Sequence, residues 1–173
     1  MIINKSNIST MPEYFNRYIE LAPNEPINRE LLENNENNEN YVIDVFSKNI
    51  DKENYAYASG KWTIKQIMQH IIDTERVMAY RILCMARGDK YDFPGYDENQ
   101  YAEFAKVTDR NIPELLKEFH HLRQSNILML ESFDYSDYFR SGIVWGKGMC
   151  VISLAYVVVG HPIHHINVIN ERY

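Results

Sequence analysis

Cysteine and glycine are scarce in this chain of 173 residues, and each scarcity limits the fold. The two cysteines, Cys84 and Cys150, lie far apart and form no CxxC pair. A disulfide framework is therefore not expected, and each thiol should behave as a small buried hydrophobe in a reducing compartment. Only 7 glycines occur, and no two alternating strands are joined by an Asn-Gly turn, so helical periodicity dominates.

Long runs of one charge sign or of apolar residues are also lacking. The formal net charge is -6, with acidic and basic residues interspersed, so neither nucleic acid nor an anionic membrane is an expected partner. Residues 1–7 contain no apolar segment of the signal-peptide type, and the apolar stretch at residues 151–159 is too short to span a bilayer. Glycine-rich phosphate loops and GxSxG nucleophile motifs are absent as well. We therefore expect a soluble, cytoplasmic protein.

The composition nevertheless supplies enough material for a packed core. Hydrophobic residues make up 45% of the chain and aromatic residues 13%, whereas disordered chains are poor in aromatics. This length and composition predict one domain over residues 1–173. Pro23 and Pro26 break the chain, and residues 1–27 are expected as an N-terminal extension packed on the domain.

Helix start signals and apolar spacing predict two long helices in the middle of the chain. Thr63 and Gln66 form a capping box, apolar residues then recur at helical spacing, and Gly88 is a natural stop. The second helix begins near Asn111, which is a good N-cap, and Pro113 lies in its first turn.

The flanking segments extend this all-α expectation. The last helix, at about residues 149–172, is apolar nearly all round and should lie in the middle of the protein. A helical stretch over residues 28–49 contains the polar run 34–40, which is either a solvated helix face or a frayed loop. Shorter elements are expected as helices at residues 12–21 and 97–106 and as a turn-rich loop at residues 134–148. Four substantial helices with short connections predict a four-helix bundle.

Histidines carry the clearest chemical signal. His161 and His165 are spaced i, i+4 on the last helix, so both rings lie on one side, close enough to share a metal ion. The spacing alone is weak, because two core histidines satisfied by neighbouring groups would show it too. His70 lies on the flank of the apolar stripe of its helix, at a helix–helix seam, where a single histidine is more often a packed core residue than a ligand.

The remaining polar candidates have simpler interpretations. His164 points about 100° away from His165 and is expected to support the site from outside or to lie at an interface. Glu75 projects into an apolar stripe and needs a partner, so a structural ion pair is favoured over a role in orienting a histidine. Pro162, together with Gly160, either opens the last helix beside the histidines or only improves its packing. His120 and His121 stand among charged residues and should be exposed or half-exposed.

These residues belong to longer signatures. The first is WTIKQIMQHIIDTER at residues 62–76, continued by AYRILCMARGD at 79–89 and PGYD at 94–97. The second is AY at residues 155–156 followed by GHPIHHI at 160–166. Together they resemble the DinB/YfiT-like family of metal-dependent helical proteins, and the resemblance covers about residues 28–173.

The resemblance implies a four-helix bundle in up-down-down-up order with a metal site at one end. The family's ligand pattern maps onto His70, His161 and His165, and Pro162 departs from the pattern by following the first ligand of the pair. Three imidazoles leave open positions on the ion, which is typical of a catalytic site. They suit zinc, nickel, iron or manganese, and zinc is favoured.

Function is expected to follow the metal. Family members are similar to thiol S-transferases that use low-molecular-weight thiols and to a mycothiol-dependent isomerase, and many are homodimers. We therefore expect a homodimeric thiol S-transferase or hydrolase that acts on a small molecule through a metal-activated thiol or water. The alternatives are a non-catalytic metal- or ligand-binding stress-response protein and a helical interaction module without metal. A second acid–base group over the ion would favour the enzyme, and Glu75 and Tyr96 are the candidates.

Overall fold

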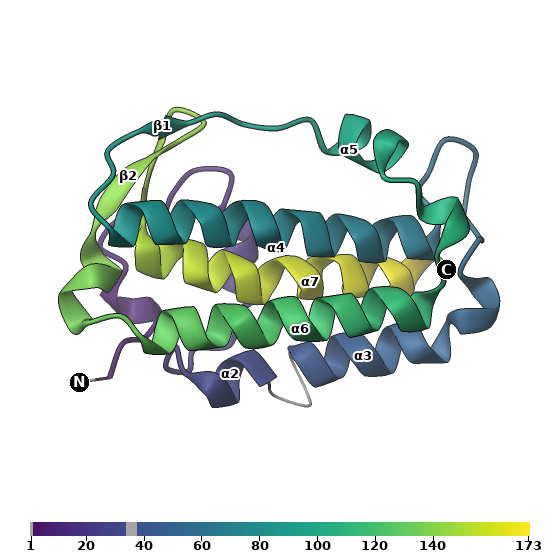
Figure 1. Ribbon diagram of the computed structural model, residues 1–173, viewed down its shortest axis with the longest axis horizontal. Coiled ribbons are helices and arrows are strands. Elements are labelled where there is room, and N and C mark those ends of the chain that lie inside the picture. Colours follow the sequence, from purple (N-terminus) through teal and green to yellow (C-terminus); the bar gives the residue numbers. More distant parts are fainter. Residues whose placement is uncertain (1, 34–37) are drawn as a thin grey trace.

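Four roughly aligned helical segments form the body of the protein (Figure 1). A computed structural model describes residues 2–33 and 38–173. The first segment consists of two short helices, and the other three are long: α2 (Arg29–Glu33), α3 (Glu39–Lys48), α4 (Ile64–Ala86), α6 (Ile112–Glu131) and α7 (Val151–Arg172). In Figure 1, α3 and α7 run from left to right, whereas α4 and α6 run from right to left. The predicted four-helix bundle in up-down-down-up order is therefore confirmed.

The two long middle helices begin where the sequence predicts. Thr63 caps α4 by accepting from the backbone N–H of Gln66, while the Gln66 side chain accepts from the backbone N–H of Thr63. Asn111 and Glu114 make the same reciprocal pair at the start of α6. These caps satisfy backbone donors that a helix start leaves free.

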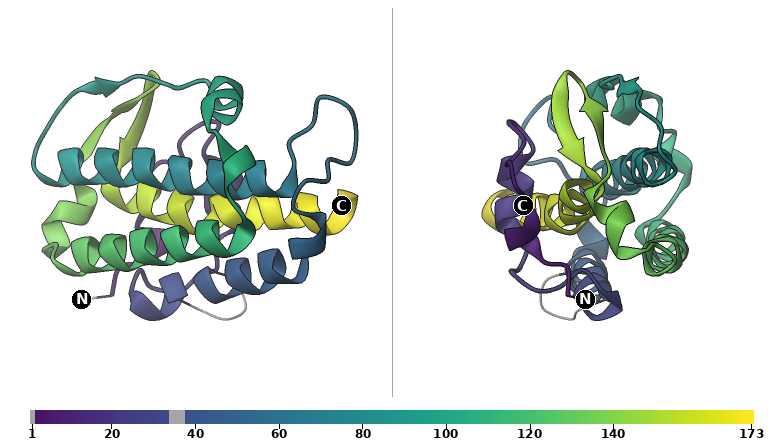
Figure 2. Two further views of the ribbon diagram at one scale, coloured as in Figure 1. Left: turned by 45° about the vertical axis from the view of Figure 1, so that its right-hand side comes forward. Right: turned by 90° about the vertical axis from the view of Figure 1, so that its left-hand side faces the viewer.

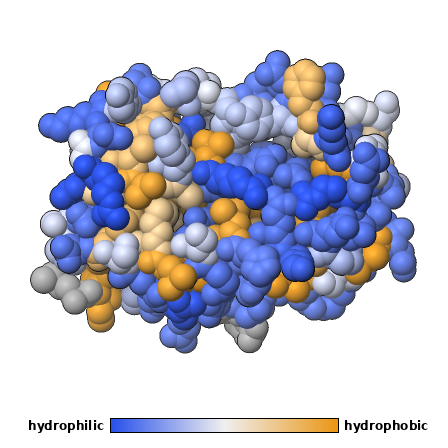
Figure 3. Space-filling model, viewed as in Figure 1, coloured by the Kyte–Doolittle hydropathy of each residue, from blue (hydrophilic) through white to orange (hydrophobic). Residues whose placement is uncertain are grey.

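Helix α7 lies at the centre of the bundle, as its composition predicts, and packs on α3, α4 and the short N-terminal helix α1 (Asn16–Leu21). It is long and apolar enough to cross a membrane, yet 78% of its apolar window is buried inside the protein. The core helix of a soluble protein has this character, and the surface in Figure 3 is largely hydrophilic with scattered hydrophobic side chains. The helix starts two residues later than expected, because Met149 and Cys150 belong to a strand.

A small three-stranded sheet occupies one end of the bundle, where the sequence predicts only a turn-rich loop. Its strands are β1 (Asp92–Phe93), β2 (Ser141–Val144) and β3 (Lys147–Cys150); β1 is parallel to β2, and β2 is antiparallel to β3. The hairpin turns at Trp145 and Gly146, whose φ angles are 51° and 69°. Two left-handed residues give the turn that hairpins favour, but Asn-Gly usually forms it. Because Trp145 occupies the usual place of asparagine, the turn rules do not predict this hairpin.

The N-terminal segment packs against the bundle. Helix α1 (Asn16–Leu21) starts later than the predicted residue 12, because Tyr14 adopts a left-handed φ of 72° that no helix tolerates. The right-hand view of Figure 2, along the bundle, shows this segment beside α7 and the hairpin above the long helices. The other elements are α5 (Glu98–Phe104) and 3-10 turns at Lys5–Asn7, Ile50–Lys52, Val107–Asp109 and Tyr135–Phe139.

The polar run at residues 34–40 is described only in part, because residues 34–37 lie outside the described residues. Asn38 and Glu39 are both buried, so this end of the run is not a solvated helix face. Asn38 is held by polar partners from other helices, which a reading of periodicity could not reveal.

A buried ion pair joins α4 to α6 in the bundle core. The Arg123 guanidinium grips both carboxylate oxygens of Glu75, at 2.9 and 2.8 Å, and Asn126 also donates to Glu75 at 3.0 Å. Arg123 donates further to Asn38 Oδ1 and to backbone carbonyls of Leu32 and Val158, so all five of its N–H groups are used. Glu75 therefore forms the predicted structural ion pair, with a partner from another helix.

Candidate metal centre

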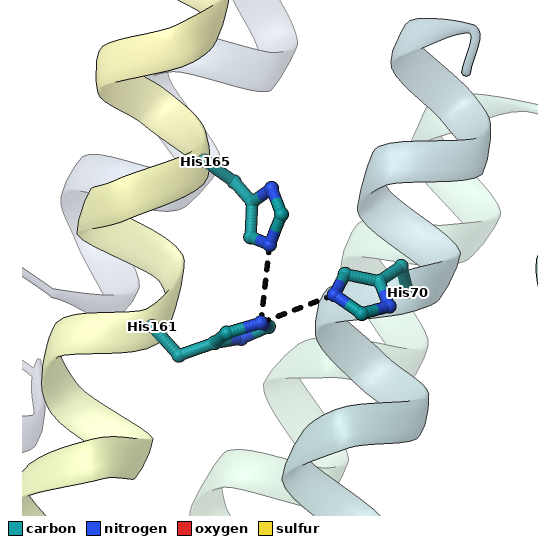
Figure 4. Close-up of side chains that lie close together, drawn as sticks. All are labelled: His70, His161 and His165. Carbon is teal, nitrogen blue, oxygen red and sulfur yellow. Dashed lines mark hydrogen bonds between the residues drawn. The ribbon is translucent and has the colours of Figure 1, made fainter. Parts of the chain in front are cut away.

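Three imidazole rings from two helices converge at one point. The Nε2 atom of His161 lies 3.1 Å from His70 Nε2 and 3.1 Å from His165 Nε2 (Figure 4). The ligand atoms of all three side chains lie within 4.8 Å of one another. His161 and His165 are one turn apart on α7, and His70 faces them from α4. The structure thus brings together the three histidines that the family resemblance selects.

Hydrogen bonding alone explains this cluster poorly. An imidazole nitrogen carries either one proton or one in-plane lone pair, so His161 Nε2 cannot form a good bond with both neighbours at once. A cation held by all three nitrogens removes the conflict. Tetrahedral zinc at ordinary Zn–N distances places its nitrogen ligands about 3.3 Å apart, close to the two 3.1 Å separations. The donor set and its spacing therefore fit a divalent metal ion.

Burial keeps these rings neutral. It lowers the pKa of His70 to about 4, with a smaller contribution from His164. Burial also lowers the pKa values of His161 and His165 far below the usual value, and the neighbouring histidines add to the effect. A neutral imidazole presents the lone pair that a metal needs, so at neutral pH the cluster is in its binding form.

Helix α7 carries His161 and His165 through an irregular stretch without ending. Pro162 lacks an N–H, so the Val158 carbonyl loses its helical partner. Arg123 Nη2 donates to that carbonyl at 3.4 Å, and Asn38 donates to the next one, at Val159, also at 3.4 Å. The buried Arg123 thus satisfies the backbone beside the two histidines.

Gly160 allows another segment to approach this stretch closely. A Cβ atom at Gly160 would overlap the carbonyl oxygen of Tyr18 on α1. With no Cβ there, the Tyr18 ring reaches the edges of His161 and His164, with centroid distances of 5.2 and 5.6 Å. Gly160 therefore serves close packing, whereas Pro162 leaves the Val158 carbonyl without its helical partner.

A cavity of about 550 Å³ opens onto the three histidines. One wall is a stripe of α4 and another comes from Tyr96 in the loop after β1. The N-terminal segment and the hairpin contribute aromatic side chains, which include Tyr14, Tyr18 and Trp145. Cavities of this size, with a few polar groups among apolar walls, are typical of small-molecule sites.

The other predicted candidates divide clearly. His164 is half-buried, lies outside the converging set and lines the same cavity, and its predicted role as a supporting or interface residue stays a prediction. His120 and His121 are exposed on α6, also as predicted. Glu75 does not line the cavity, because Arg123 holds it in the core.

Tyr96 is the candidate acid–base group that reaches the cavity. Its hydroxyl lies 2.5 Å from Thr74 Oγ1, one turn after His70 on α4. Burial raises the pKa of Tyr96 to about 12, so its hydroxyl keeps its proton at neutral pH. At neutral pH the side chain is therefore a hydrogen-bond donor rather than a base.

Sequence reasoning missed several residues of the cavity. Thr74, Met78 and Arg81 follow His70 at offsets of 4, 8 and 11, and a helical projection would have placed them on its face. Tyr14 and Tyr18 give no comparable signal, because they reach the site through long-range packing. The Trp62 ring, 4.7 Å from that of His70, lies in the first signature but was not singled out.

A helical bundle with a three-histidine cluster defines the class of protein, and comparison with known proteins gives the family. The sequence pattern of the DinB superfamily matches residues 42–169, and the chain belongs to that superfamily. The fold is similar to that of YfiT from Bacillus subtilis, described as a probable metal-dependent hydrolase with an unusual four-helix bundle topology. The TM-score is 0.62 with 18% identity, over 86% of this chain and 89% of YfiT. No curated protein matches the chain.

Proposed function

We propose that this protein is a metal-dependent enzyme whose ion is held by the Nε2 atoms of His70, His161 and His165. The observation that carries the proposal is the convergence of three neutral imidazoles, two of them buried and that of His165 half-buried, at the wall of a cavity. Three protein ligands leave at least one position on the ion for a substrate or water, as in catalytic zinc sites. Zinc is the favoured ion, and nickel, iron and manganese are the other candidates.

The reaction proposed is hydrolysis or thiol transfer on a small molecule. A divalent ion in this site would lower the pKa of a bound water or thiol and so supply a nucleophile at neutral pH. The chain's own contribution is to bind and orient the substrate in the cavity, with Tyr96 donating a hydrogen bond from beside Thr74. The description of YfiT favours the hydrolase, and a low-molecular-weight thiol as co-substrate is the second candidate.

A non-catalytic metal-binding role is the alternative, and Tyr96 argues against it. A storage or sensor site needs its ligands only, whereas this one has a protonated hydroxyl on the wall of an adjoining cavity. Assembly as a homodimer and a cytoplasmic location remain predictions from the sequence.

Metal content of protein purified without an affinity tag tests the site. We expect about one ion per chain in the wild type and in His121→Ala, which removes an exposed histidine. We expect His70→Ala and His161→Ala to lose it while remaining folded by circular dichroism. Wild-type protein that takes up no zinc, nickel, iron or manganese after reconstitution would refute the proposal.

Activity of the loaded enzyme separates the reactions. Ester and amide substrates should be cleaved without added thiol if the protein is a hydrolase, whereas a model electrophile should be consumed only with a thiol if it is a transferase. Turnover should require the metal and should fall in Tyr96→Phe. Stoichiometric metal with no turnover across both panels would favour the non-catalytic alternative.

A further inference from the structure

Arg81 is a buried arginine that lines the cavity and forms no ion pair with a carboxylate in the described parts of the chain. Its side chain is on α4 and the residue is 4% exposed. The Arg81 guanidinium donates hydrogen bonds from Nη2 to the Pro94 carbonyl, at 2.6 Å, and from Nη1 to the Met78 sulfur, at 3.5 Å. Among the described residues, no carboxylate lies within ion-pair distance of it. Two of its five N–H groups are thus engaged, one of them with a weak acceptor.

Arg123 shows what a purely structural buried arginine looks like in the same protein. It is 0% exposed, grips Glu75 with two bonds and uses its three other N–H groups on Asn38 and two backbone carbonyls. A buried charge is costly unless it is paired. Burial accordingly lowers the pKa of Arg81 below that of a free guanidinium, with no opposing carboxylate. The guanidinium remains charged at any physiological pH.

Arg81 lies on the same face of α4 as the ligand position His70. Arg81 follows His70 by eleven positions. That offset rotates the side chain by about 20° beyond three full turns and moves it about 16 Å along the helix axis. Thr74 and Met78 occupy the turns between them, and all four side chains line the cavity. The stripe thus has the histidines at one end, a hydroxyl and a thioether in the middle, and a cation at the other end.

The cavity's own carboxylates do not neutralise Arg81. Asp97 lines the cavity, but its Oδ1 accepts from the backbone N–H groups of Asn99 and Gln100 as the cap of α5. Glu98 also lines the cavity and forms no ion pair with Arg81 in the described parts of the chain. An anionic group from a bound molecule is therefore the partner that this guanidinium lacks.

We infer that the cavity binds an elongated small molecule whose carboxylate pairs with Arg81, while its other end reaches the three histidines. The role of that other end rests on the proposed function; the pairing with Arg81 does not. Val144 and Val157 also line the cavity, so a chain or ring of apolar character fits between the two ends. A planar guanidinium matches a carboxylate with two parallel hydrogen bonds.

Calorimetric titration of the full chain, with and without zinc, tests the pairing between Arg81 and a carboxylate. The probes are hexanoate, octanoate and 3-phenylpropanoate, each compared with its primary amide, which has the same shape and no charge. The chain is first stripped with a chelator and then reloaded with zinc, and both forms are titrated. Hydrogen bonds to a charged group contribute enough that we expect a carboxylate to bind about tenfold or more tighter than its amide. This preference should be present in both forms.

Substitutions assign the preference to one side chain. Arg81→Met should bring carboxylate and amide to about equal affinity. Arg87→Met removes an exposed arginine near the end of the same helix, outside the cavity, and should keep the full preference. Arg81→Lys guards against a folding defect in the methionine variant, because it keeps the charge and should retain a smaller preference.

Two outcomes would overturn the inference: no carboxylate binds wild-type protein at millimolar concentration, or the preference survives in Arg81→Met stripped of metal. Failure of the metal site is seen separately, because it removes zinc uptake and leaves the preference of the stripped protein intact.

Discussion

Removing Arg123 should destabilise this protein more than almost any other single change. In Arg123→Met the Glu75 carboxylate stays buried at 3% exposure without its cation, and Asn38 and the Val158 carbonyl lose a donor. Breaking a buried pair by removing one partner costs about 3–5 kcal/mol. For a chain of this size, each kcal/mol lowers Tm by roughly 2–4 °C, so Tm should fall by about 6–20 °C.

Urea unfolding followed by circular dichroism measures the change in the free energy of unfolding, and two further variants serve as controls. Arg123→Met combined with Glu75→Leu removes both charges and should recover most of the lost stability, because no uncompensated charge remains. Arg76→Met breaks a partly exposed pair with Glu118 and should cost about 1 kcal/mol or less. A single variant that loses no more stability than Arg76→Met, or a double variant as unstable as the single one, would refute the reasoning.

Three further changes test the packing and the site. Gly160→Ala forces a methyl group against the Tyr18 carbonyl and should lower the free energy of unfolding by about 1–3 kcal/mol or more in urea titrations, and an unchanged midpoint would contradict the close approach. Zinc at a thousandfold excess over its Kd should raise that free energy by about 4 kcal/mol in the wild type and in His121→Ala but not in His161→Ala. Tyr96→Phe should lower kcat by roughly 100-fold or more on any substrate found, with zinc content unchanged, if its hydroxyl acts as an acid; equal kcat would remove it from the mechanism.

The bundle was predictable because its signals are local. The capping boxes at Thr63 and Asn111 and the apolar spacing behind them depend on residues within a few positions of each other. The hairpin and the start of α1 were not predictable, because each depends on an aromatic residue in a left-handed conformation. Trp145 and Tyr14 hold these conformations where their rings pack edge to face, 5.4 Å apart, across 131 positions of sequence.

The site was predictable in part for a similar reason. The i, i+4 spacing paired His161 with His165, but only the resemblance to a family joined His70 to them. Arg81 lay within a recognised signature, yet nothing local indicates that a buried arginine lacks a carboxylate. That property depends on every neighbour in the fold.

The Tyr14 and Tyr18 wall has a consequence for how relatives of this protein could diverge. Both tyrosines lie outside residues 42–169, the part matched by the superfamily, whereas all three histidines lie within it. Separate stretches of the chain thus supply the groups that would hold the ion and the two tyrosines that shape one side of the cavity. An altered N-terminal segment could therefore change which molecules enter while leaving the three histidines in place.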